Sequence, residues 1–115
     1  MSQPVVHYEI VGPDAKVLQD YYRSLFDWKI NADNPMNYGM VEPGEGGIAG
    51  GVGPSPDGQA HVTFYIQVPD LQAALDKAAK LGGKTATPPM DIPDGPSIAH
   101  FTDPAGNMVG LVKEM

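Results

Sequence analysis

Residues 5–28 read VVHYEIVGPDAKVLQDYYRSLFDW, and residues 61–83 read HVTFYIQVPDLQAALDKAAKLGG. Each stretch starts with a strand-like run, reaches Pro-Asp, and continues with apolar residues at helical spacing. Asp14 and Asp70 each suit a helix N-cap, because a carboxylate accepts from the free N–H groups of the first turn. They lie 56 residues apart (70 − 14). Other pairs at this offset share their residue type: Ile10 with Ile66, Pro13 with Pro69, and Leu25 with Leu81. The chain therefore contains a repeated strand–helix unit.

Further strands are expected after each helix, because the 14 glycines and 12 prolines cluster between short apolar runs. In the first half we expect a strand over 38–42, and either a strand or a loop in the glycine-rich run 46–52. The expected elements of the second half are a short strand over 84–87, a loop over 88–95, and strands over 97–102 and 108–112.

This order predicts the fold class. We expect one α+β domain of two βαβββ modules, module one spanning residues 1–57 and module two residues 58–115. A single module would leave one face of its sheet uncovered. We therefore expect the two modules to form one curved mixed sheet around a cavity, with the helices outside.

Composition excludes several functions. The chain has no cysteine, so it offers no disulfide, thiolate metal site or cysteine nucleophile. Fourteen acidic against seven scattered basic residues give a formal charge of −7, which argues against nucleic acid as a partner. No run approaches the roughly 20 apolar residues of a membrane span. The N-terminus lacks the features of a signal peptide, so we expect a soluble cytoplasmic protein that does not bind membranes.

Four short motifs occur in the order found in one known family. They are His-Tyr-Glu-Ile at 7–10, Leu-Gln-Asp-Tyr-Tyr-Arg-Ser-Leu-Phe-Asp-Trp at 18–28, Val-Pro-Asp at 68–70 leading to Leu-Gly-Gly at 81–83, and Asp-Pro-Ala-Gly-Asn at 103–107. With them the chain resembles the vicinal oxygen chelate superfamily, which includes glyoxalases, bleomycin-resistance proteins and dioxygenases. The resemblance implies paired βαβββ modules, a small-molecule cavity and a homodimer.

Enzymes of that superfamily hold a divalent metal with a His on the first strand and a Glu on the last strand of each module. The resemblance places these positions at His7, Thr63, Gly110 and within residues 46–52, where no carboxylate occurs. One ligand of four remains, and a transition metal needs two or three converging protein donors. We therefore expect no metal cofactor. The alternative is a rebuilt site drawn from His7, Glu9, His61, His100 and Glu42.

The candidate site follows from strand alternation, which puts His7 and Glu9 on one face of their strand. They are our candidate catalytic pair, an imidazole tuned by a carboxylate. In the register of Gly110 we expect four ligand-binding residues: Thr63, Tyr65, Met108 and Val112. These suit an apolar or aromatic ligand. The aromatic residues of the first half are expected to form the core face of the helix and the strand beside it: Tyr21, Tyr22, Phe26 and Trp28.

The sequence leaves three hypotheses. The first is a small-molecule-binding protein of the glyoxalase/bleomycin-resistance type without the metal site. The second is an enzyme, either a metal-dependent lyase, isomerase or dioxygenase with a departed ligand set, or one that uses only His7 and Glu9. The third is a scaffold with a vestigial cavity.

Overall fold

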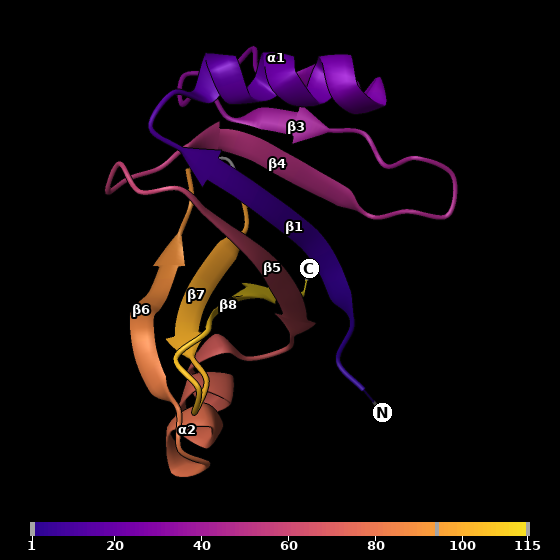
Figure 1. The fold of residues 1–115 in the computed structure, drawn as a ribbon. Coiled ribbons are helices and arrows are strands. Elements are labelled where there is room, and N and C mark those ends of the chain that lie inside the picture. The colour runs from indigo at the N-terminus through magenta and orange to yellow at the C-terminus, as the bar shows by residue number, and fades with distance from the viewer. Residues whose placement is uncertain (1, 94, 115) are drawn as a thin grey trace. The chain divides into compact units, whose positions relative to one another are not determined.

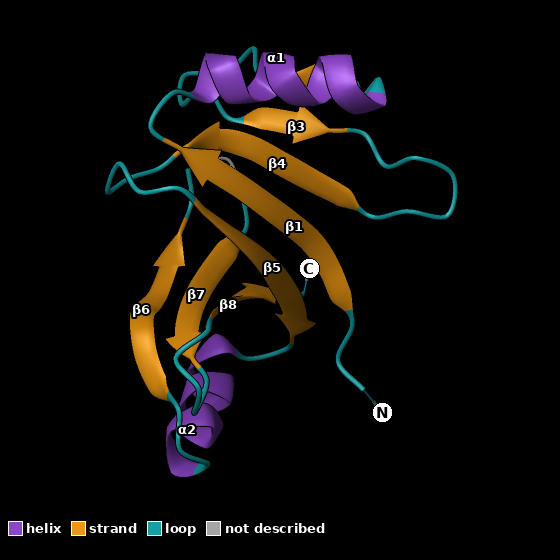
Figure 2. Cartoon of the chain, viewed as in Figure 1, coloured by secondary structure: helices purple, strands orange, loops and turns teal. Residues whose placement is uncertain are grey.

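The computed structural model describes residues 2–93 and 95–114, which form two helices and eight strands (Figures 1 and 2). They divide into two compact units. The first unit comprises residues 7–63, and the second comprises residues 64–114 with residues 2–6. Each unit combines one helix with strands of mixed direction, so the predicted α+β class is confirmed. Among the described residues, neither helix has the length and apolar character needed to cross a membrane.

The first unit contains α1 and the sheet β2-β3-β4-β1. The bounds are Val5–Gly12 for β1, Ala15–Phe26 for α1, Ile30–Asn31 for β2, Gly39–Val41 for β3 and Ala49–Pro54 for β4. β4 pairs in parallel with β1 and antiparallel with β3. α1 lies along β3 and β4 (Figure 1). The run 46–52, which the sequence left open, is therefore partly loop and partly the start of β4.

α1 begins where the sequence predicts it, because the Asp14 carboxylate accepts from the backbone N–H of Val17 at 3.2 Å. Its buried face carries Gln19, which is only 2% exposed. The Gln19 amide donates to the carbonyl oxygens of Asn37 at 3.0 Å and Val52 at 2.8 Å, so this buried polar group is satisfied. The approach needs Gly39, since a Cβ there would press on Gln19 Nε2 and on the Val52 carbonyl.

The second unit repeats this plan with α2 and the strand order β5-β8-β7-β6, although residues 61–63 at the start of β5 belong to the first unit. The bounds are His61–Val68 for β5, Leu71–Lys80 for α2, Lys84–Asp91 for β6, Ser97–Thr102 for β7 and Met108–Lys113 for β8. β8 pairs in parallel with β5 and antiparallel with β7. The Asp70 carboxylate caps α2 by accepting from Ala73 N at 3.0 Å, and Gly82 ends the helix with a positive φ of 106°.

The second unit has a continuous apolar core between α2 and its sheet. The buried members come from both elements: Val68, Leu71, Leu75, Ala99 and Leu111. Because Ile66, Leu111 and Ala99 are directly paired across three strands, this row defines the sheet face that α2 covers. The next row along the strands, which starts at Tyr65, faces away from α2.

The expectation that the aromatic residues around α1 form a core face is wrong for two of them. Tyr21 is 57% exposed and Phe26 is 55% exposed, while Tyr22 and Trp28 are half-buried and stacked at 5.2 Å. The helix instead presents Ala15 and Gln19 to the glycine-rich strand. A small residue and a hydrogen-bonding amide fit this close approach better than large rings do.

Residues 88–91 belong to a strand and not to the loop that the sequence predicted. β6 continues through Pro88 and Pro89 to Asp91, with register irregularities on both sides of Thr87. β6 is an edge strand whose partner is β7. Proline lacks the N–H that an inner strand needs, and an edge strand with bulges tolerates that loss.

Candidate functional site

His7 and Glu9 lie on the face of β1 that points away from α1. The intervening Tyr8 contacts Trp28, with ring centroids 5.6 Å apart, and Trp28 in turn stacks on Tyr22 of α1. Since side chains alternate along a strand, His7 and Glu9 project to the opposite face. Both are half-buried. The structure thus keeps together the two residues that the sequence paired as a catalytic candidate.

Tyr38 is the residue of this face that the sequence analysis missed. Its hydroxyl lies 3.0 Å from Nε2 of His7, in hydrogen-bond contact. The Tyr38 ring also covers Gly51 of β4, so a Cβ built at residue 51 would overlap the phenol. A signal was present, because a strand with three glycines among four consecutive residues needs large side chains from elsewhere to cover it. That signal does not say which residue provides the cover.

Electrostatics favour a neutral His7. Burial lowers the pKa of the His7 imidazole below its ordinary value of 6.5, and the Glu9 carboxylate opposes this by raising it. Burial is the larger effect. The imidazole is therefore uncharged at neutral pH, when it is able both to donate and to accept a hydrogen bond.

This pKa predicts a pH dependence of stability. The folded chain binds a proton at His7 less readily than the unfolded chain, so stability is lost as the pH falls through about 6.5 and below. His7→Gln keeps a polar side chain beside Tyr38 and should unfold in urea with a weaker dependence on pH between about 7.5 and 5. Glu9→Gln should strengthen the dependence, because it removes the charge that raises the His7 pKa. If the wild-type protein and both variants showed the same dependence of stability on pH, His7 would not be the group responsible.

The second unit contains a similar arrangement around Tyr65, which is 5% exposed. Tyr65, Gly110 and His100 are directly paired across β5, β8 and β7. The Tyr65 hydroxyl lies 2.8 Å from Nε2 of His100. Its ring covers Gly110, where a Cβ would overlap it. Met108 and Val112 flank Gly110 on the same face.

Thr63 lies two residues before Tyr65 and on the same face of β5. It is 4% exposed, and its hydroxyl oxygen has no hydrogen-bond partner among residues 2–93 and 95–114. Of the six predicted site residues, the structure places His7 and Glu9 together on β1 and groups Tyr65 with Met108 and Val112. Met108 is the most exposed of these, at 36%.

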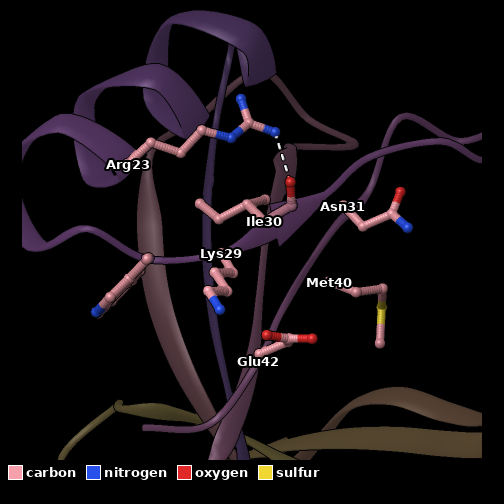
Figure 3. Close-up of a pocket in the computed structure, with 7 residues that line it drawn as sticks. Arg23, Lys29, Ile30, Asn31, Met40 and Glu42 are labelled. Atoms are coloured by element: carbon pink, nitrogen blue, oxygen red, sulfur yellow. Dashed lines mark hydrogen bonds between the residues drawn. The ribbon is translucent and has the colours of Figure 1, made fainter.

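A hollow of about 380 Å³ lies elsewhere in the first unit, at the end of α1 (Figure 3). Its lining residues are Arg23, Trp28, Lys29, Ile30, Asn31, Met40 and Glu42. The guanidinium of Arg23 donates to the Ile30 carbonyl at 2.7 Å (Figure 3) and to the Asp20 carboxylate at 3.0 Å, so it is engaged within the protein. The hollow includes none of the predicted site residues.

Comparison with known proteins identifies the superfamily of this chain. The model of the Glyoxalase/Bleomycin resistance protein/Dioxygenase superfamily matches residues 5–111. The chain belongs to this superfamily, as its motifs predict. "Putative glyoxylase CFP32" from Mycobacterium bovis and from Mycobacterium tuberculosis is 32% identical over 113 residues, covering 85% of this chain and 41% of the relative. The chain thus spans about two-fifths of the length of these relatives.

Solved structures share the fold at low sequence identity. The hypothetical protein BH1468 from Bacillus halodurans C-125 matches with a TM-score of 0.72 at 15% identity, covering 100% of this chain and 96% of that one. A variant of the Streptomyces coelicolor methylmalonyl-CoA epimerase, in complex with 2-nitronate-propionyl-CoA, matches with a TM-score of 0.67 at 16% identity, covering 98% and 99%. A protein with the same fold therefore binds a CoA derivative.

The residues present do not fit the divalent metal that the superfamily resemblance implies. Gly51 and Gly110 hold corresponding places on the last strand of each unit, and neither has a carboxylate. The rings of Tyr38 and Tyr65 fill the space that a side chain there would need. His7 already contacts Tyr38 through Nε2. Within the part of the chain that the structure describes, no three His, Asp or Glu side chains are grouped as metal ligands.

Proposed function

We propose that this chain binds a small apolar or aromatic molecule without a divalent metal. The residues we assign to binding lie on strand faces that point away from the helices: His7, Glu9, Thr63, Tyr65, Met108 and Val112. Bleomycin-resistance-type binding needs no chemical step, so it requires no metal ligand. The observation that supports this proposal most directly is the covering of Gly51 and Gly110 by tyrosine rings.

The charge of the strands favours an uncharged ligand. β1 and β5 contain no lysine or arginine, and Lys113 at the end of β8 shares the face of Leu111 that α2 covers, while Glu9 adds a negative charge to the face of β1. An anionic ligand would find no lysine or arginine on the faces of β1, β5 and β8 that point away from the helices and would lose its hydration. We therefore do not carry over the CoA derivative of the epimerase to this chain.

The test is a thermal-shift measurement with 2-naphthol, a neutral aromatic probe. We expect 2-naphthol to raise the melting temperature and EDTA to leave that rise unchanged, because a ligand that binds the folded state alone stabilises it. The anionic probes 2-naphthoate and coenzyme A should give no rise. Met108→Ala should reduce the effect of 2-naphthol, while the matched control Met90→Ala on the edge strand β6 should not.

Two results would contradict the proposal. One is no rise with 2-naphthol in the wild-type protein, and the other is a rise that EDTA abolishes.

The proposal also includes a homodimer, which light scattering of the purified protein measures directly. A monomer at all concentrations would remove that part alone.

A second candidate function is proton transfer by His7 and Glu9 without a metal. The observation that favours it is the pair formed by Nε2 of His7 and the Tyr38 hydroxyl, since a phenol and an imidazole in contact are able to pass a proton. Deuterium exchange in D2O into the methyl group of 2-acetylnaphthalene, a neutral aromatic ketone, tests it. Exchange that His7→Gln abolishes would favour the enzyme, and no exchange in the wild type would reject it for this substrate.

A further inference from the structure

The two units contain the same three-residue arrangement. In each, a tyrosine ring covers a glycine of the last strand, and the hydroxyl of that tyrosine contacts Nε2 of a histidine, at 3.0 Å in the first unit and 2.8 Å in the second. The first set is Tyr38, Gly51 and His7, and the second is Tyr65, Gly110 and His100.

The two glycines hold equivalent places, because β4 and β8 each lie between a parallel and an antiparallel partner. The tyrosines and histidines do not. Tyr38 precedes β3 whereas Tyr65 lies on β5, and His7 belongs to β1 whereas His100 belongs to β7. The arrangement is therefore not a relic of the 56-residue repeat, since each unit builds it from different strands.

We propose that Tyr38 and Tyr65 are positioning residues that hold His7 and His100 by their Nε2 atoms, and that each phenol–imidazole pair is a polar group that its own strand face offers to a ligand, with Glu9 beside the pair of the first unit. The second part rests on the proposed function. The first part concerns the protein alone.

The hydrogen bond between the phenol and the imidazole limits what else the histidine binds. A nitrogen that exchanges a hydrogen bond with a phenol has its lone pair or its proton committed to that phenol. Nε2 is then not offered to a metal ion. The pair as a whole is uncharged when the imidazole is neutral, and it suits carbonyl or hydroxyl oxygens better than carboxylates or phosphates.

Nitrogen-15 NMR of histidine-labelled protein tests the positioning role, because the ring shifts report the ratio of the two neutral tautomers. The chain has three histidines, so His61 serves as an internal control. Tyr38→Phe should change the tautomer ratio of His7 by about fivefold, the equilibrium effect of a typical hydrogen bond, and leave His100 and His61 unchanged. Tyr65→Phe should change His100 alone. Both variants keep the ring over its glycine.

The wild-type protein provides the second measurement. His7 and His100 should each show one dominant neutral tautomer, and equimolar Zn²⁺ should leave their signals in place. The inference would be overturned if neither substitution changed the tautomer ratio of its histidine. It would also be overturned if Zn²⁺ shifted the signals of His7 or His100. These spectra need no ligand, so they succeed or fail independently of the 2-naphthol experiment.

Discussion

Gly110→Glu is expected to destabilise the second unit by about 3 kcal/mol or more. Gly110 is buried on β8, and the Tyr65 ring occupies the space of any side chain at that position. Overpacking costs about 1–3 kcal/mol, and a buried carboxylate without a partner adds about 1–3 kcal/mol. Urea denaturation measures the loss, provided the slope of the transition is unchanged. The substitution restores the residue type of a family metal ligand and should still be harmful.

A double variant attributes this loss to the ring. In a Tyr65→Ala background the glutamate has space, so the added cost of Gly110→Glu should fall well below its cost in the wild type. Gly44→Glu is the matched control, because nothing lies near a Cβ at residue 44 and the change should stay within about 0.5 kcal/mol. Equal costs in both backgrounds would reject the role of Tyr65.

Leu75→Ala is expected to cost about 2–5 kcal/mol, the range for removing a buried leucine side chain. Leu75 belongs to α2, is 1% exposed and packs against the apolar row of the sheet that this helix covers. The truncation leaves a cavity that the close-packed neighbours fill only in part. For a domain with a total stability of about 5–15 kcal/mol, this is a large fraction.

Leu81→Ala makes the same chemical change just after the end of α2, where the side chain is 70% exposed. Its effect should stay within about 0.5 kcal/mol. Thermal or urea unfolding of both variants checks the contrast. A loss at Leu81 as large as the loss at Leu75 would contradict the burial assigned to this core.

Local chemistry explains why much of the fold is predictable. The Asp14 and Asp70 carboxylates cap their helices through backbone N–H groups three residues on, a contact that depends only on neighbouring residues. Gly82 ends α2 with a positive φ, which glycine adopts without strain. Period-two alternation likewise identifies β5 and puts Thr63 and Tyr65 on one face.

Contacts between distant segments explain the failures. Helical periodicity around α1 could not show that Tyr21 and Phe26 stay exposed, because that depends on the strand the helix meets. Pro88 and Pro89 are typical of loops, and they are tolerated in β6 because β6 is an edge strand. For α1 the deciding strand, β4, lies more than twenty residues further along the chain, whereas for β6 the deciding fact is its place at the end of the strand order, beside β7.

The two strand–helix repeats, their caps, the superfamily and the lack of carboxylates in the last strands can all be read from the amino-acid sequence. What takes the place of those carboxylates depends on how the strands are arranged in space. Tyr38 reaches Gly51 across 13 positions (51 − 38), and Tyr65 reaches His100 across 35. A glycine in a strand shows that something approaches it closely. Which ring does so is fixed by strand order and register, because these place side chains from separate strands in one row.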